Sequence, residues 1–122
     1  MPKTIYPVGR YRGITRAVVT ELERRGFTVV RDWTKEDPGT HRSSIAVEDL
    51  YAATHCDVVL LMWTDGMKGA WVEVGAALAV DALVIAVDAR REDCIFLDHP
   101  GVEHVQHLED AIALMEKLNG KA

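Results

Sequence analysis

Val58-Val-Leu-Leu-Met62 is an unbroken apolar run, and Leu83-Val-Ile-Ala-Val87 is a second run of the same kind. Continuous apolar runs of this length are typical of strands that are covered on both faces. On either side of this pair, segments 14–25 and 107–118 place apolar residues at helical spacing. Because strands alternate with helices along the chain, the sequence predicts an α/β sandwich with a central, mainly parallel sheet of about five strands.

The remaining elements follow from turn residues, caps and periodicity. We expect strands at 4–8, 27–30 and 102–105, helices from 43 or 44 to 54 and from 69 to 80, and loops at 31–42 and 89–94. Ser43 or Ser44 supplies a hydroxyl that can cap the first of these helices. Pro7 cannot donate a hydrogen bond to a neighbouring strand, so we expect the pairing of the first strand to end or become irregular there.

The composition indicates one domain that spans residues 1–122. Hydrophobic residues make up 48% of the chain, enough for a proper core, and the formal net charge of −5 argues against a nucleic-acid polymer as partner. Cys56 and Cys94 fit no metal-binding spacing and the five histidines form no helical pair, so we expect no metal and no cofactor. The sequence has no long apolar run and no signal-peptide pattern, so we expect a cytoplasmic protein without a membrane partner.

Glu73 is a lone carboxylate in the apolar segment Gly69-Ala-Trp-Val-Glu-Val-Gly-Ala-Ala-Leu-Ala79. A buried charge is costly unless it is paired, and the free N–H groups and dipole at a helix N-terminus favour an anion. Glu73 is therefore either a salt-bridged residue in the first turn of this helix or an ionised carboxylate that meets a ligand as a nucleophile.

The place of Glu73 along the chain connects it to a pocket. Parallel α/β sheets bind ligands beyond the carboxyl ends of their strands. In this chain those ends lead into Gly9–Gly13, the loop of Trp33, Trp63–Gly66 and Asp88. Because its helix begins shortly after one of these ends, we expect Glu73 at the mouth of the pocket.

The loop Gly9-Arg-Tyr-Arg-Gly13 holds two arginines between glycines, just before a predicted helix. Such a loop can bring backbone N–H groups and the guanidinium groups of Arg10 and Arg12 onto one phosphate. Two arginines at a helix start can equally be solvated. The loop matches neither a dinucleotide-binding fingerprint nor a P-loop.

Asp49 is the candidate partner of Glu73. It lies in the helix before strand 58–62, where it points either into the pocket or to solvent. Two carboxylates in different environments can cleave a glycosidic bond, because one attacks the anomeric carbon while the other moves a proton or orients the sugar. Trp33 and Trp63 lie at or just beyond strand ends, where they stack on a base, pack in the core or contact another subunit.

Four parts of the sequence carry a resemblance to a known family. They are Met1–Tyr6 with Gly9–Gly13, Glu48-Asp49-Leu50 with Cys56–Val59, Gly69–Ala77 as the motif G-x-x-x-E-x-G-x-A, and Ile95-Phe96 with His99–Val102. In order and spacing they resemble the nucleoside 2-deoxyribosyltransferase superfamily, including its 2'-deoxynucleoside 5'-phosphate N-hydrolase-like members, over most of the chain. The resemblance implies a flavodoxin-like or Rossmann-like three-layer sandwich.

The resemblance also implies roles for single residues. Glu73 would be the nucleophile that forms a deoxyribosyl-enzyme intermediate, Asp49 the proton donor and orienter, and Tyr6 a residue that helps position Glu73. The arginine loop looks like the phosphate-binding loop of the nucleotide hydrolases, with Arg12 as the best match. The expected substrate-binding residues are Gly9, Arg10, Arg12, Gly13, Trp33, Trp63, Asp65 and Gly69. Members of the family commonly form homodimers or larger homo-oligomers, and we expect the same here.

Two positions depart from the family's transferases. Met67 stands where they carry the acidic residue that holds the base, although Asp65 lies nearby. Their asparagine after the next strand has no clear counterpart, although Cys94 and Asp98 are close. We therefore expect cleavage of the N-glycosidic bond of 2'-deoxynucleosides or their 5'-monophosphates, with transfer to another base or to water. The alternatives are a non-catalytic nucleotide-sensing module on the same fold and an interaction protein without a small ligand.

Overall fold

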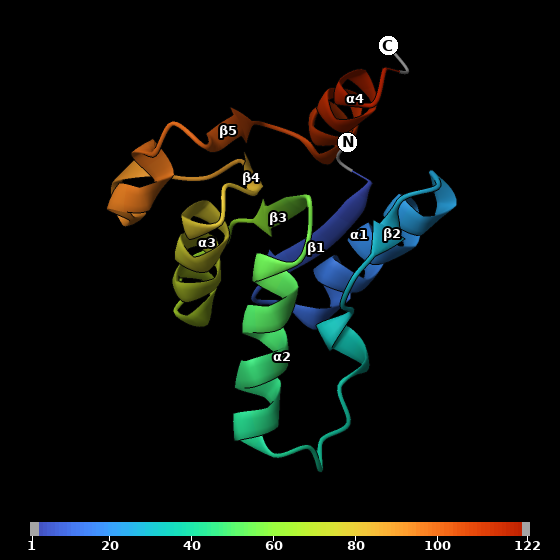
Figure 1. Ribbon diagram of the computed structural model, residues 1–122, viewed down its shortest axis with the longest axis vertical. Helices are drawn as coiled ribbons and strands as arrows, with labels where there is room; N and C mark the ends of the chain where they lie inside the picture. Colours follow the sequence, from blue (N-terminus) through green and yellow to red (C-terminus); the bar gives the residue numbers. More distant parts are fainter. Residues whose placement is uncertain (1–2, 121–122) are drawn as a thin grey trace.

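A five-stranded parallel sheet forms the centre of the computed structural model, which describes residues 3–120 (Figure 1). The strand order is β2-β1-β3-β4-β5. The strands are β1 (Thr4–Gly9), β2 (Thr28–Val29), β3 (Val58–Met62), β4 (Leu83–Val87) and β5 (Val102–Val105). The helices are α1 (Arg12–Arg24), α2 (Arg42–Thr54), α3 (Gly69–Ala79) and α4 (Leu108–Leu118), with short 3-10 turns η1 (Trp33–Lys35), η2 (Arg91–Asp93) and η3 (Ile95–Asp98). This arrangement confirms the predicted flavodoxin-like α/β sandwich.

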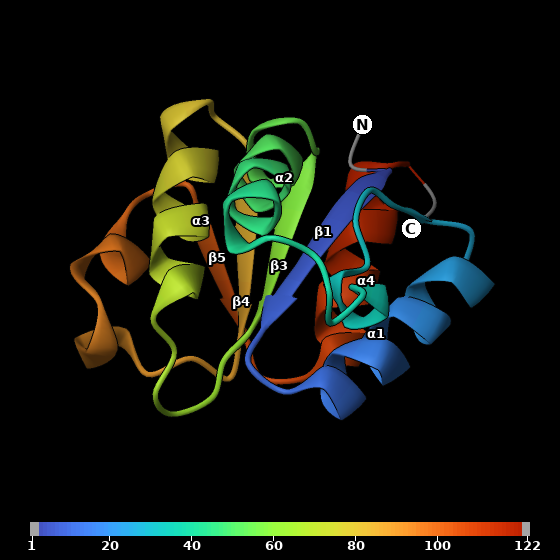
Figure 2. The ribbon, with the colours of Figure 1, turned by 90° about the horizontal axis from the view of Figure 1, so that it is seen from below.

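Helices cover both faces of the sheet, which explains the apolar central strands. Helices α2 and α3 lie on one face, and α1 and α4 lie on the other (Figure 2). Successive side chains of β3 alternate between two cores, so that Val59 and Leu61 pack under α2 and α3 while Val58 and Leu60 pack under α1 and α4. A strand with both faces buried has no position for a polar side chain, and β3 and β4 contain none.

The expectation for Pro7 was wrong on one side of its strand and correct on the other. Strand β1 stays in register with β3 through Pro7 and on to Gly9, so this ladder is not interrupted. Its pairing with β2, in contrast, covers only Thr4 and Ile5. Ile5 bonds toward β2 through its carbonyl, so by alternation the nitrogen of Pro7 also faces that side. The missing N–H therefore lies where β2 has already ended.

The start of α2 also differs from the prediction. The helix begins at Arg42, after His41, and no side chain makes a capping hydrogen bond. Neither Ser43 nor Ser44 is the cap, because both already lie inside the first turn. Helix α2 is instead held mainly by packing, through its buried Ala52 and by its contact with α3.

The strand order places a crevice beside β1 and β3. The chain leaves β1 toward β2 through α1 and then returns across β1 to β3 through α2. The connections on the two sides of this point cover opposite faces, so the loops after β1 and β3 separate and leave room for a ligand. Within residues 3–120, no helix has both the length and the apolar character needed to cross a membrane.

Truncation of the central strand is expected to destabilise the protein strongly. Leu60 is fully buried in β3, so Leu60→Ala leaves a cavity and should lower the free energy of unfolding by about 3 kcal/mol. Val47→Ala on the exposed side of α2 should change it by less than about 0.5 kcal/mol. Denaturant unfolding of both variants checks this, and equal losses would contradict the two-sided burial of β3.

Candidate active site

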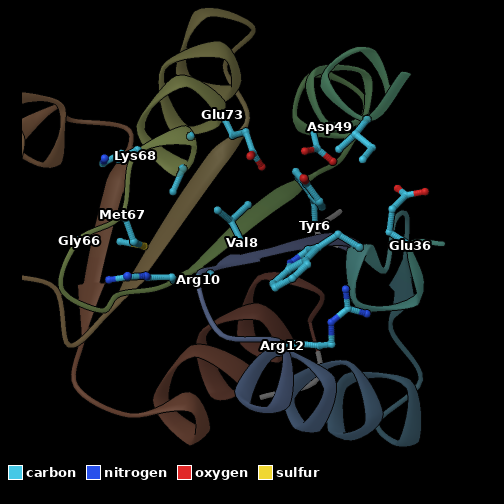
Figure 3. A pocket seen from close by; sticks show the side chains of 15 residues that line it. Tyr6, Val8, Arg10, Arg12, Glu36, Asp49, Gly66, Met67, Lys68 and Glu73 are labelled. Carbon is cyan, nitrogen blue, oxygen red and sulfur yellow. The ribbon is translucent and has the colours of Figure 1, made fainter. Parts of the chain in front are cut away.

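A cavity of about 380 Å³ lies at the carboxyl ends of β1 and β3, in the crevice that the strand order predicts (Figure 3). Its walls come from β1 and the loop that follows, from η1, from α2, and from the loop and helix after β3. The lining residues are Tyr6, Val8, Gly9, Arg10, Arg12, Trp33, Glu36, Ile45, Asp49, Gly66, Met67, Lys68, Gly69, Ala70 and Glu73. The cavity therefore gathers segments from the first two thirds of the chain.

Glu73 lies in α3 and points into the cavity (Figure 3). It is the fifth residue of the helix, so it belongs to the second turn and not to the first turn where free N–H groups would favour its charge. Among residues 3–120 it forms no ion pair at salt-bridge distance. The first-turn salt bridge that the sequence allowed is therefore absent from the described chain.

Burial raises the pKa of Glu73 to about 7. The nearby Asp49 adds to the rise, whereas a hydrogen bond from the Tyr6 hydroxyl and the charge of Arg31 oppose it. Near neutral pH this carboxyl group therefore exists in both its protonated and its ionised form. Such a group at a cavity wall can act as a nucleophile once it is ionised, because little solvation has to be removed from it.

Tyr6 rises from β1 between the two carboxylates (Figure 3). Its ring is almost completely buried, and burial together with Glu73 and Asp49 raises its pKa well above the ordinary range. The hydroxyl consequently keeps its proton and donates to Glu73. Tyr6 can therefore orient the carboxylate without adding charge to the cavity.

Asp49 projects from α2 into the cavity, which decides between the two orientations that the sequence left open (Figure 3). Its Oδ1 accepts a hydrogen bond of 2.7 Å from Nε of Arg31. An aspartate already engaged by a guanidinium is better suited to accept a hydrogen bond from a ligand hydroxyl than to donate a proton. Glu48, its neighbour, is the more exposed of the two and meets Arg31 at 3.4 Å.

Arg31 and Glu36 are site components that the sequence analysis did not single out. Glu36 lines the cavity, and its carboxylate pairs with Arg31, which lowers the pKa of Glu36. Burial disfavours the charge of Arg31, but its hydrogen bonds to Asp49 and Glu36 outweigh this and raise its pKa. One signal was available, because Arg31 directly follows the second predicted strand and thus stands at the ligand-binding edge of the sheet.

Arg10 and Arg12 lie on the side of the cavity opposite Glu73 and Asp49 (Figure 3). Nη1 of Arg10 donates to the carbonyl of Asp65 at 2.7 Å, and its guanidinium packs on Gly66. Gly66 has a φ of +77°, and a Cβ there would clash with this guanidinium. Arg10 therefore ties the loop after β1 to the loop after β3.

Arg12 stands at the start of α1 and donates to the carbonyl of Thr34. A guanidinium has five N–H donors, so this bond leaves others for a ligand. Helix α1 carries no acidic residue in its first turn, so nothing there competes with an anion for its free N–H groups. The rim opposite the carboxylates therefore has the chemistry to accept a phosphate.

Three of the expected substrate-binding residues do not line the cavity: Gly13, Trp63 and Asp65. The Trp63 indole donates to Asp93 at 2.9 Å, and the guanidinium of Arg90 lies 5.0 Å from the centre of its ring. The guanidinium of Arg90 thus occupies one face of the Trp63 ring, so that face is not free to stack on a base. Because Arg90 and Asp93 follow β4, Trp63 joins the loops after β3 and β4. Trp33, in contrast, does line the cavity, together with Gly9 and Gly69.

The chain matches no protein-family model and no curated protein sequence. Within residues 3–120, no group of three or more His, Cys, Asp or Glu side chains is arranged to hold a metal ion.

Replacing Glu73 is expected to stabilise the protein in a pH-dependent manner. The pKa of Glu73 lies above its ordinary value of 4.5, so the folded state holds the proton more tightly, and stability falls as pH rises from about 4.5 to about 7. Glu73→Gln keeps the neutral shape and should therefore stabilise the fold by about 2 kcal/mol more at pH 8 than at pH 5. Thermal and denaturant unfolding at both pH values measures this.

The exposed Glu23 of α1 provides the matched control, and Glu23→Gln should show no such pH difference. A Glu73→Gln variant that is equally stable relative to wild type at both pH values would contradict the desolvated carboxylate.

Proposed function

We propose that this protein cleaves the N-glycosidic bond of 2'-deoxynucleosides or their 5'-monophosphates, with Glu73 as nucleophile and with transfer of the sugar to another base or to water. The observation that carries the proposal is the pair of carboxylates, Glu73 and Asp49, on neighbouring helices that face one cavity above the buried hydroxyl of Tyr6. The family resemblance of the sequence supports Glu73 as the nucleophile, Tyr6 as the residue that positions it, and Asp49 as a residue that orients the substrate.

The chemistry runs in two steps. Ionised Glu73 forms a bond to C1' of the sugar while the bond from C1' to the base nitrogen breaks, and its electron pair leaves with the base. The base takes up a proton from solvent at the open cavity or from a protein carboxyl group. In the second step, water or an acceptor base attacks C1', loses a proton, and releases the Glu73 carboxylate. Tyr6 orients Glu73, and Asp49 accepts a hydrogen bond from a sugar hydroxyl.

The proposal extends to assembly and location. We expect a homodimer or larger homo-oligomer, as in the family that the sequence resembles, and a cytoplasmic location. The free thiols of Cys56 and Cys94 are in keeping with a reducing compartment. The ligand is a small molecule, because a cavity of about 380 Å³ has the size of small-ligand sites and the carboxylates of Asp49 and Glu36 would repel a polyanion.

A nucleotide-sensing module is the second candidate, since a fold of this kind hosts many functions. Arg10 and Arg12 at the rim favour it, because they could retain a nucleotide without any chemistry. Under this reading, Glu73 would only contact a ribose hydroxyl.

Base release is expected from at least one member of a panel of deoxynucleosides and their 5'-monophosphates, followed by chromatography with and without an acceptor base. Glu73→Ala should reduce it by about 10³-fold or more while ligand binding persists. Because the ionised carboxylate is the nucleophile and its pKa is about 7, activity should rise from pH 6 to pH 8 with its midpoint near 7. Glu23→Ala on the exposed face of α1 is the control and should retain full activity.

No release from any member of the panel would overturn the enzymatic proposal. Titration calorimetry with the same nucleotides would then test the sensing module, in which Glu73→Ala chiefly lowers affinity.

Arg12 is expected to select for the monophosphate. Arg12→Leu should lower kcat/KM for a deoxynucleoside 5'-monophosphate by about tenfold or more and leave the free nucleoside almost unchanged, since only the former offers a phosphate. Arg16 lies one turn further along α1 and donates to Thr34 Oγ1 at 3.0 Å, outside the cavity lining. Arg16→Leu is therefore the control, and equal losses for both substrates would contradict phosphate binding by Arg12.

A further inference from the structure

Arg31 lies two residues beyond the end of β2 and reaches three carboxylates with three different nitrogen atoms. Its Nε donates to Asp49 at 2.7 Å, its Nη1 meets Glu48 at 3.4 Å, and its Nη2 pairs with Glu36. Only 15% of the Arg31 side chain is exposed. A guanidinium can serve three partners in one plane, whereas a lysine ammonium offers a single compact charge.

Two of these partners are cavity residues from different parts of the chain. Asp49 belongs to α2, and Glu36 follows η1. Arg31 itself does not line this cavity but a separate surface hollow, which it shares with Glu48, so it reaches both carboxylates from behind the cavity wall. Without it, the Asp49 and Glu36 side chains would be free to turn toward solvent, and their charges would face the ligand without compensation.

The charged and titratable groups that act on Glu73 come from three elements. They are Tyr6 of β1, Asp49 of α2 and Arg31 after β2. Strands β3 and β4, against which α3 also packs, carry apolar residues only. The adjacent η3 carries Asp98, which pairs with Arg91 at 3.4 Å.

We propose that Arg31 is a positioning residue of this site: it holds Asp49 and Glu36 in place and supplies a positive charge behind Asp49, the carboxylate that shares the cavity with Glu73 on the neighbouring helix. The inference rests on the proposed function for its effect on turnover. The effect of Arg31 on the charge of Glu73 does not depend on the proposed function, because it can be measured in the protein without substrate.

The first test is the titration of the Glu73 side-chain carboxyl by carbon-13 NMR in the full chain. Removing a nearby positive charge favours the protonated form, so Arg31→Met should raise the pKa of Glu73 by about one unit. Arg31→Lys should bring it back toward the wild-type value. Arg31→Gln keeps a donor for Asp49, has the same expected rise, and takes the place of the methionine variant if that variant does not fold.

The matched control is Arg25, another arginine shared by two carboxylates and 25% exposed. It pairs with Glu21 and Glu109, which are residues of α1 and α4 on the opposite face of the sheet. Arg25→Met should lose a similar ion-pair network and leave the pKa of Glu73 unchanged. An unchanged pKa in both Arg31→Met and Arg31→Gln would overturn the inference.

The second test is the pH profile of base release. In Arg31→Met, the midpoint of the rising limb should move to higher pH by the same amount as the pKa of Glu73. Arg31→Lys should restore this midpoint but not the full turnover, because one ammonium group cannot hold Asp49 and Glu36 together. A loss of turnover without movement of the midpoint would reduce Arg31 to a structural role. If wild type releases no base while the NMR shift occurs, the proposed function fails and the electrostatic inference stands.

Discussion

The rest of the structure depends on a sheet whose central strands are buried on both faces. Such strands admit no polar side chain, so the polar groups lie in the loops and on the solvent-facing sides of the helices around the sheet. The strand order then selects one place among these loops, because α1, which follows β1, and α2, which precedes β3, cover opposite faces of the sheet. The cavity is thus a consequence of how the core is covered.

Within the cavity, the two carboxylates are treated differently by their surroundings. Asp49 has a guanidinium at 2.7 Å, whereas Glu73 has no ion-pair partner in the described chain and faces a neutral phenol. One carboxyl group is therefore held as a hydrogen-bond acceptor, and the other has a pKa near 7. This separation of roles between two acids suits glycosidic chemistry, which needs one group to attack and another to orient.

The same arrangement links stability to function. A desolvated Glu73 destabilises the folded state above neutral pH. The burial of the central sheet contributes the free energy of folding that offsets this loss. Arg10 holds the loop after β1 against the loop after β3, because it donates a hydrogen bond to the carbonyl of Asp65 and packs on Gly66. Both loops border the cavity. A site held by the β1 and β3 loops together can keep its shape when it is empty.

The sequence by itself determined the layers, the parallel sheet and the position of Glu73 near its carboxyl edge, because hydrophobic periodicity and strand polarity are local properties of the chain. It could not determine that β1 keeps its ladder with β3 through Pro7, since that depends on which neighbouring strand the nitrogen of Pro7 faces. Tertiary structure also decided that Asp49 points inward, that Trp63 is engaged by Arg90 and Asp93, and that Arg31 joins Asp49 to Glu36. These outcomes depend on contacts between side chains that are far apart in the sequence. The free energy of such contacts is set by packing and charge in the folded protein.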